Sequence, residues 1–182
     1  MQELNVVDEN DNVIGKDTRE NIHKDGLLHR EIAIWIFNNK EEIIFQKRSL
    51  TKEKDPGLLS GSCAGHVDEN ENYDQAAIRE LEEETGIRAK KEDLIFLEKF
   101  KIGDSNSRSN SANNHFKKVY AYHFTGKSAD LKIEEGEATS LEFWPIDKVL
   151  NLNEEEKKEF VSTVADGVFT EIFKKIKKLS AK

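Results

Sequence analysis

The chain has 182 residues, a length that fits one domain with a buried core and leaves little room for two. It carries 28 basic and 36 acidic residues for a net charge of -8, which argues against a protein that coats nucleic acid and favours a small-molecule ligand. No run of about 18 apolar residues occurs, so no membrane span is expected. Met1 begins a polar segment, so no secretory signal is expected either. Cys63 is the single cysteine, which rules out an intramolecular disulfide and fits a reducing cytoplasm.

The first part of the chain predicts strands joined by polar turns. Residues 3–7 and 13–15, separated by a turn-forming segment, predict an N-terminal β-hairpin. Residues 30–37 are apolar at nearly every position, as in a strand that is buried on both faces. A further strand is expected over 42–48, followed by a polar loop over 49–55.

The second part predicts more strands and then helices. A stretch of Ser, Asn, Gly, Asp and Arg at residues 103–114 predicts a flexible loop, with a role as a lid left open. From Pro145 onward the apolar spacing becomes helical. The expected strands cover 94–102, 116–124 and 141–144, and the expected helical segments cover 146–150, 154–165 and 168–179.

The most informative stretch is residues 65–87. Its spacing follows the pattern G-x5-E-x7-R-E-U-x-E-E-x-G-U, in which U is aliphatic. A chance match is expected at roughly one start position in a billion at average residue usage. The matching residues are Gly65, Glu71, Arg79, Glu80, Leu81, Glu83, Glu84, Gly86 and Ile87.

The acidic residues of this stretch make chemical sense on a helix over residues 72–86. At about 100° per residue, Glu80, Glu83 and Glu84 fall on one side of that helix. Three carboxylates near a helix C-terminus repel one another and face the negative end of the helix dipole, so a cation is expected beside them. Mg2+ or Mn2+ takes carboxylate oxygens and also coordinates phosphates.

This pattern resembles the Nudix box. The resemblance implies an α/β fold, a Nudix α/β/α sandwich with a mixed β-sheet, to which the predicted N-terminal β-hairpin is an extension, with residues 1–182 forming a single domain. It also implies a hydrolase that depends on Mg2+ or Mn2+ and cleaves a diphosphate bond, in a nucleoside diphosphate linked to another moiety or in a related organic diphosphate.

The same resemblance assigns roles residue by residue. Glu80, Glu83 and Glu84 would hold the metals together with the carbonyl of Gly65, and one of the three glutamates would orient or deprotonate the attacking water. Arg79 would pair with Glu71 as a structural support. A further glutamate outside the box often serves the metals or the water in this family, and Glu137 fits that position best, with Glu134 and Glu135 remaining open.

Outside the box, most of residues 3–150 resembles the branch of the family related to isopentenyl-diphosphate isomerase. The matches include Arg48 and Lys52, which by this resemblance would contact the substrate diphosphate. They also include His23, His29 and His66, which would form a second metal site. Ordinary surface or core histidines are the alternative for these three.

The departures from the isomerase favour hydrolysis. Isomerisation needs a cysteine and a glutamate for proton transfer. The cysteine's position falls on Ala64, with Cys63 displaced by one residue, and the glutamate's position falls on His115. A neighbouring metal-binding glutamate is replaced by Asn113. Conversely, this chain keeps the whole Arg79–Glu84 run that the isomerase lacks.

Two alternatives to a hydrolase stay open. A shift of the loop by one residue would restore Cys63 as the isomerase's acid, and a non-catalytic Nudix module would use the fold to bind a ligand. Specificity is expected in residues 103–114, around Trp35 and Phe37, and in the C-terminal helices. The sequence leaves the substrate's identity open, and also whether the protein is a homodimer.

Overall fold

The computed structural model describes residues 2–104 and 113–181, and their centre is a mixed sheet in the order β5-β4-β3-β8-β7. Strand β6 also pairs with β3, and β9 pairs with β4. The β3–β8 pairing is parallel and the other pairings of this sheet are antiparallel. The strands are β3 (His29–Phe37), β4 (Glu42–Arg48), β5 (Leu59–Ser60), β6 (Cys63–His66), β7 (Leu94–Asp104), β8 (Asn113–His123) and β9 (Ala138–Pro145).

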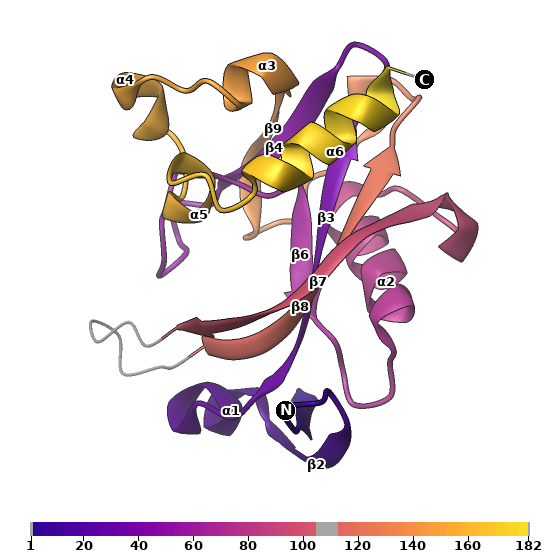
Figure 1. The fold of residues 1–182 in the computed structure, drawn as a ribbon, viewed down its shortest axis with the longest axis vertical. Coiled ribbons are helices and arrows are strands. Elements are labelled where there is room, and N and C mark those ends of the chain that lie inside the picture. The colour runs from indigo at the N-terminus through magenta and orange to yellow at the C-terminus, as the bar shows by residue number, and fades with distance from the viewer. Residues whose placement is uncertain (1, 105–112, 182) are drawn as a thin grey trace.

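Helices cover both faces of this sheet (Figure 1). Helix α2 (Tyr73–Thr85) lies on one side and α6 (Thr170–Ser180) on the other. Strand β3 alternates between the two, because Ile34 and Ile36 belong to the core beneath α2, whereas Trp35 and Phe37 belong to the core beneath α6. The prediction of a doubly buried strand is confirmed, and so is the α/β/α sandwich.

The N-terminal segment forms the predicted hairpin, β1 (Glu3–Val7) paired with β2 (Val13–Thr18). Helix α1 (Arg19–Asp25) follows, which the sequence pattern did not predict because seven residues are too few to show a helical period. Thr18 caps its first turn and Gly26 ends it in the left-handed conformation. No helix in the described residues combines the length and apolar character that a membrane crossing requires.

The predicted helix over residues 154–165 is wrong. Two short helices, α4 (Glu154–Lys157) and α5 (Ser162–Ala165), stand in its place, after α3 (Ile146–Val149). Between α4 and α5, Phe160 forms a parallel bridge with Leu59 of β5: the Leu59 amide donates to the Glu159 carbonyl at 2.7 Å, and the Val161 amide donates to the Leu59 carbonyl at 2.9 Å.

The predicted loop over 103–114 is partly strand, since β7 continues to Asp104 and β8 begins at Asn113. The rest of that loop, residues 105–112, lies outside the described residues, and so does its expected role as a lid.

Candidate active site

Helix α2 has defined ends at both termini. The Asn72 side chain accepts hydrogen bonds from the amides of Asp74 and Gln75, and the Gln75 side-chain oxygen accepts one from the Asn72 amide. Gly86 ends the helix at φ 72°. The helix therefore begins and ends where its sequence predicts, and the position of each glutamate in its last turns is fixed.

The three box carboxylates converge but differ in exposure. The side chain of Glu83 is 51% exposed and that of Glu80 14%, whereas Glu84 is buried. The Arg79 guanidinium donates to Glu80 at 2.7 Å and to Glu83 at 3.0 Å. Its other nitrogens contact both carboxylate oxygens of Glu71, at 2.8 and 3.0 Å. Arg79 thus links the loop before α2 to the carboxylate cluster.

Glu84 receives its hydrogen bonds from uncharged donors. The Gln46 amide donates to Oε2, and the Ala64 backbone amide donates to Oε1 at 3.3 Å. Burial, followed by the charge of Glu80, raises the pKa of Glu84 to about 8, and burial also raises the pKa of Glu80. The cluster is therefore costly to keep ionised without a cation.

Gly65 approaches Glu80 so closely that no side chain fits there. A Cβ at this position would lie 2.0 Å from Oε1 and 2.1 Å from Cδ of Glu80. The carboxylate thus fills the space that the missing side chain leaves, and the backbone of β6 lies directly against it.

A pocket of about 370 Å³ opens in front of these carboxylates. Arg48 and Lys52 lie in its lining, and Lys52 forms an ion pair with Glu137. The Ser49 amide donates to the Glu137 carbonyl at 2.9 Å, which ties the two loops together. The pocket therefore gathers cationic groups opposite the acidic cluster.

Three further residues show where the sequence-based predictions agree with the pocket lining and where they do not. Glu134 lies in the lining beside Glu137, whereas Glu135 does not belong to it. Arg19, on α1, was missed because nothing in a short polar helix marks one arginine as facing a site.

The three predicted histidines lie together, and one of them, His66, belongs to the lining of the same pocket. His23 Nε2 and His66 Nε2 are 3.0 Å apart, and the ring of His29 stacks on His66 with centroids 5.3 Å apart. His29 Nδ1 donates to the Leu27 carbonyl at 3.0 Å, so its Nε2 is left as an acceptor. Among the described residues, that buried Nε2 atom has no hydrogen-bond partner.

Two further ligand-type residues, Glu31 and His115, join the histidines. Oxygens of Glu31 lie 3.7 Å from His29 Nε2, 3.6 Å from His66 Nε2 and 3.2 Å from His115 Nε2. Burial opposes ionisation of Glu31, but Lys117 at 3.1 Å and the histidines hold its pKa well below the usual range. Parallel pairing of β3 with β8 sets His29 opposite His115, so the sequence, in which they are far apart, could not show this group.

Cys63 and Ala64 face opposite sides of β6. The Cys63 side chain is 1% exposed and packs in the core beneath α2, whereas Ala64 is exposed and lies in the lining of the pocket. Burial, then the charges of Glu84 and Glu80, raises the pKa of the Cys63 thiol. The position that faces the pocket therefore carries a methyl group.

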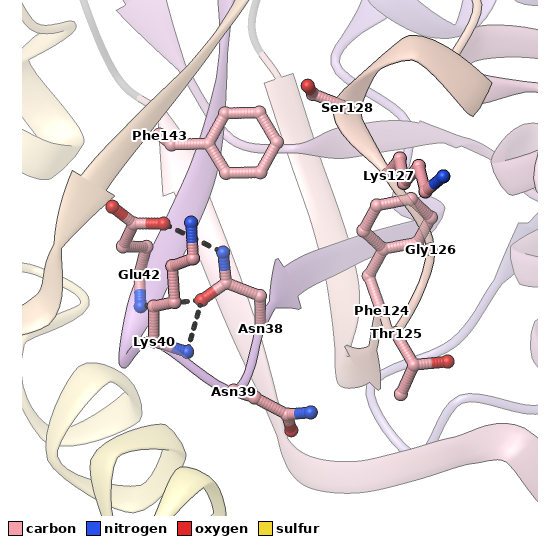
Figure 2. A pocket seen from close by; sticks show the side chains of 10 residues that line it. All are labelled: Asn38, Asn39, Lys40, Glu42, Phe124, Thr125, Gly126, Lys127, Ser128 and Phe143. Atoms are coloured by element: carbon pink, nitrogen blue, oxygen red, sulfur yellow. Dashed lines mark hydrogen bonds between the residues drawn. The ribbon is translucent and has the colours of Figure 1, made fainter.

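A second hollow, of about 590 Å³, lies at the opposite end of the sheet (Figure 2). Phe124, Phe143 and Asn38 belong to its lining. The Asn38 side chain is engaged by its own turn, because it donates to Glu42 at 2.8 Å and accepts from the amides of Lys40 and Glu42 at 2.9 and 3.1 Å. The clustered carboxylates and histidines lie at the other end of the sheet, which makes the smaller pocket the candidate site.

Comparison with known proteins agrees with this geometry. The family model described as NUDIX domain matches residues 27–164. The chain belongs to the Nudix family. An uncharacterized Nudix hydrolase of Clostridium acetobutylicum is 30% identical over 177 residues, covering 93% of this chain and 79% of that protein. The sequence-based assignment to the Nudix superfamily is confirmed.

Two further comparisons concern the branch of the family and the fold. Isopentenyl-diphosphate Delta-isomerase 2 of Photorhabdus laumondii is 43% identical over 84 residues, covering 46% of this chain and 48% of the isomerase. This Nudix chain thus spans about half the length of the isomerase that it matches. A crystal structure of a protein from Deinococcus radiodurans has a TM-score of 0.63 at 18% identity, covering 96% of this chain and 98% of that one. At this identity the likeness shows a shared fold and nothing about activity.

Proposed function

We propose that this Nudix protein, acting as a single domain over residues 1–182, hydrolyses a diphosphate bond in a nucleoside diphosphate linked to another moiety or in a related organic diphosphate. The proposed metal ligands are Glu80, Glu83 and Glu84 with the carbonyl of Gly65. Carboxylate oxygens suit Mg2+ or Mn2+, and the close approach of Gly65 to Glu80 brings backbone and carboxylate together as such a site needs. The donor set therefore fits the metal that the family uses.

Different residues around the pocket have different proposed roles in hydrolysis. When bound, the metal neutralises charge on the phosphate oxygens and lowers the pKa of a coordinated water. Glu84, buried and held by two neutral donors, is placed to accept a proton from the attacking water. In this proposal Arg48 and Lys52, which belong to the pocket lining, hold the diphosphate, and Glu137, also in the lining, orients the water. Arg79 keeps Glu80 and Glu83 in position.

The convergence of three box carboxylates on a pocket that also holds cationic side chains carries this proposal. Its test is the cleavage of a panel of nucleoside diphosphate sugars, dinucleotide polyphosphates, NADH, nucleoside triphosphates and isopentenyl diphosphate, with Mg2+ or Mn2+, followed by chromatographic separation of the phosphate-containing products. Cleavage of at least one member, lost on chelation with EDTA and restored by Mg2+, is expected. Silence across the panel would favour a non-catalytic binding module.

Replacement of Arg48 by alanine is expected to raise KM for the diphosphate substrate about tenfold and to change kcat much less. The guanidinium is placed to contact the diphosphate in both the ground state and the transition state, and loss of such uniform binding appears in KM. Steady-state kinetics on the best substrate of the panel measure this. The matched control is Lys47→Ala, because Lys47 is the preceding residue of β4 and pairs with Glu142 instead. An equal rise of KM in both variants would contradict the assignment.

The isomerase alternative depends on a thiol in the pocket. Isomerisation requires an acid that reaches the alkene, and the described lining offers Ala64 where that acid would stand. Cys63 would have to leave the core beneath α2 to reach the pocket. We therefore propose hydrolysis in preference to isomerisation. The sequence identity to the isomerase is higher than that to the Nudix hydrolase, but it extends over fewer residues.

We also propose that the histidine group, His23, His29 and His66 together with Glu31 and His115, is a second metal site. The ligand atoms of His23, His29 and His66 lie within 4.8 Å of one another, and so do those of His29, Glu31 and His115. No hydrogen bond within the described part of the chain reaches His29 Nε2, so this is the atom that a metal would satisfy. Imidazole nitrogens with one carboxylate suit Zn2+ better than Mg2+.

Replacement of His29 by glutamine is expected to remove one bound Zn2+ per chain, because it deletes the ligand common to both sets. Elemental analysis after loading with Zn2+ and exhaustive dialysis measures this stoichiometry. The matched control is His123→Gln, since His123 stacks on Phe37 outside the group. The proposal is wrong if the wild type and His29→Gln retain the same amount of Zn2+.

A further inference from the structure

Gln46 is a buried polar side chain on β4 that directly contacts the proposed machinery. It is 6% exposed and lies on the same face of the strand as Ile44, a core residue, so the strand's period predicts an apolar side chain there. Its Nε2 donates to the Ser62 carbonyl at 2.8 Å and to Glu84 Oε2. A carbonyl and a carboxylate both accept hydrogen bonds, so the orientation of the Gln46 amide is fixed by its two partners.

The two hydrogen bonds to Glu84 restrain both of its oxygens. Oε2 is held by Gln46 from β4, and Oε1 is held by the Ala64 amide from β6. Glu80 and Glu83 are instead held by Arg79. Glu84 is thus the box carboxylate whose orientation is set by the sheet and by uncharged donors.

We infer that Gln46 is a positioning residue that fixes the plane of the Glu84 carboxylate toward the metal and the attacking water, an inference that rests on the proposed function. An amide suits this task because it donates without supplying a positive charge that would compete with the metal. A carboxylate released from Gln46 would turn away from Glu80, since like charges at this spacing repel. Replacement of a group that hydrogen-bonds to a metal ligand typically lowers metal affinity or activity by about 10- to 100-fold.

The variant Gln46→Met tests this inference, because methionine keeps the length of the side chain and removes the donor. We expect kcat to fall about 10- to 100-fold with KM for the diphosphate changed by less than about threefold. We also expect weaker Mn2+ binding at the site that Glu84→Gln removes, measured by electron paramagnetic resonance. A merely structural role would lower thermal stability without moving either quantity.

The matched control is Ser62→Ala. The Ser62 hydroxyl is fully buried between β3 and β4, accepting from the Ile36 amide at 2.9 Å and donating to the Ile44 carbonyl. Its removal is expected to lower thermal stability while kcat and Mn2+ affinity stay close to those of the wild type. The inference is overturned if Gln46→Met keeps the wild-type kcat and Mn2+ affinity, or if Ser62→Ala loses both equally.

The two proposals fail in different ways. If the wild type hydrolyses no diphosphate, the proposed function fails, and Mn2+ affinity alone still decides the role of Gln46. Weaker Mn2+ binding in Gln46→Met than in Ser62→Ala then supports it. Equal binding in the two variants, or a wild type that binds no Mn2+ at the Glu84 site, overturns it.

Discussion

Glu84→Gln is expected to lower kcat by more than about 100-fold and, in the absence of metal, to raise thermal stability at pH 8.5. The loss of activity follows from removing the carboxylate to which we assign a role toward both the metal and the water. The gain in stability follows from the pKa of Glu84, which burial and Glu80 raise from 4.5 to about 8. The folded protein thus binds this proton more tightly than the unfolded chain does.

The sign of the pH dependence follows from that difference. Glu84 contributes no destabilisation below its unfolded pKa, and the metal-free fold loses stability as the pH rises from 4.5 to about 8. Glutamine is neutral throughout, so its advantage should be small at pH 4.5 and reach the order of a few kcal/mol above pH 8. Thermal melts of both proteins in EDTA across this range measure the difference.

The matched control for Glu84→Gln is Glu82→Gln. Glu82 lies on the same helix but is exposed and pairs with Arg88. The Glu82→Gln variant should have a kcat and a pH dependence of melting close to those of the wild type. A Glu84→Gln variant with nearly full activity, or with a stability difference that does not change with pH, would contradict the assigned environment of Glu84.

Gly65→Ala is expected to lower kcat by about 100-fold while the protein stays folded. The new Cβ would lie 2.0 Å from Glu80 Oε1, and this carboxylate is the far end of a flexible side chain, so it swings away rather than unfolding the chain. If Glu80 is a metal ligand, as we propose, its displacement weakens metal binding. Steady-state kinetics at increasing Mg2+, together with circular dichroism, measure the two effects separately.

Gly15→Ala controls for Gly65→Ala, because a Cβ at Gly15 would meet no atom within 4 Å. It should be as active as the wild type. Full activity of Gly65→Ala at ordinary Mg2+ concentrations would show that the position of Glu80 does not matter for turnover.

The fold was largely predictable from the sequence where the periodicity is strong. The β3 and β4 strands, the N-terminal hairpin and the box helix lie close to their expected positions, since alternation, turn residues and caps are local signals. The helix expected over residues 154–165 failed because backbone pairing with Leu59, a contact between segments distant in the chain, overrides the local pattern.

The candidate site divides in the same way. The box residues are close in sequence, so their spacing was enough to predict them. Glu31, His115 and Gln46 come from separate strands and meet the predicted residues only through the pairing of the sheet and its packing against α2. No local pattern marks such residues.

The most direct test of hydrolysis at the diphosphate is turnover in water labelled with 18O. The substrate is any panel member that the protein consumes, and the products are analysed by mass spectrometry. The account predicts one 18O atom in a phosphate-containing product, because water attacks phosphorus, and incorporation that is slower by more than about 100-fold with Glu84→Gln. Double-bond migration of isopentenyl diphosphate with no 18O in any phosphate group would contradict it and would make Cys63, rather than Glu84, the residue to study.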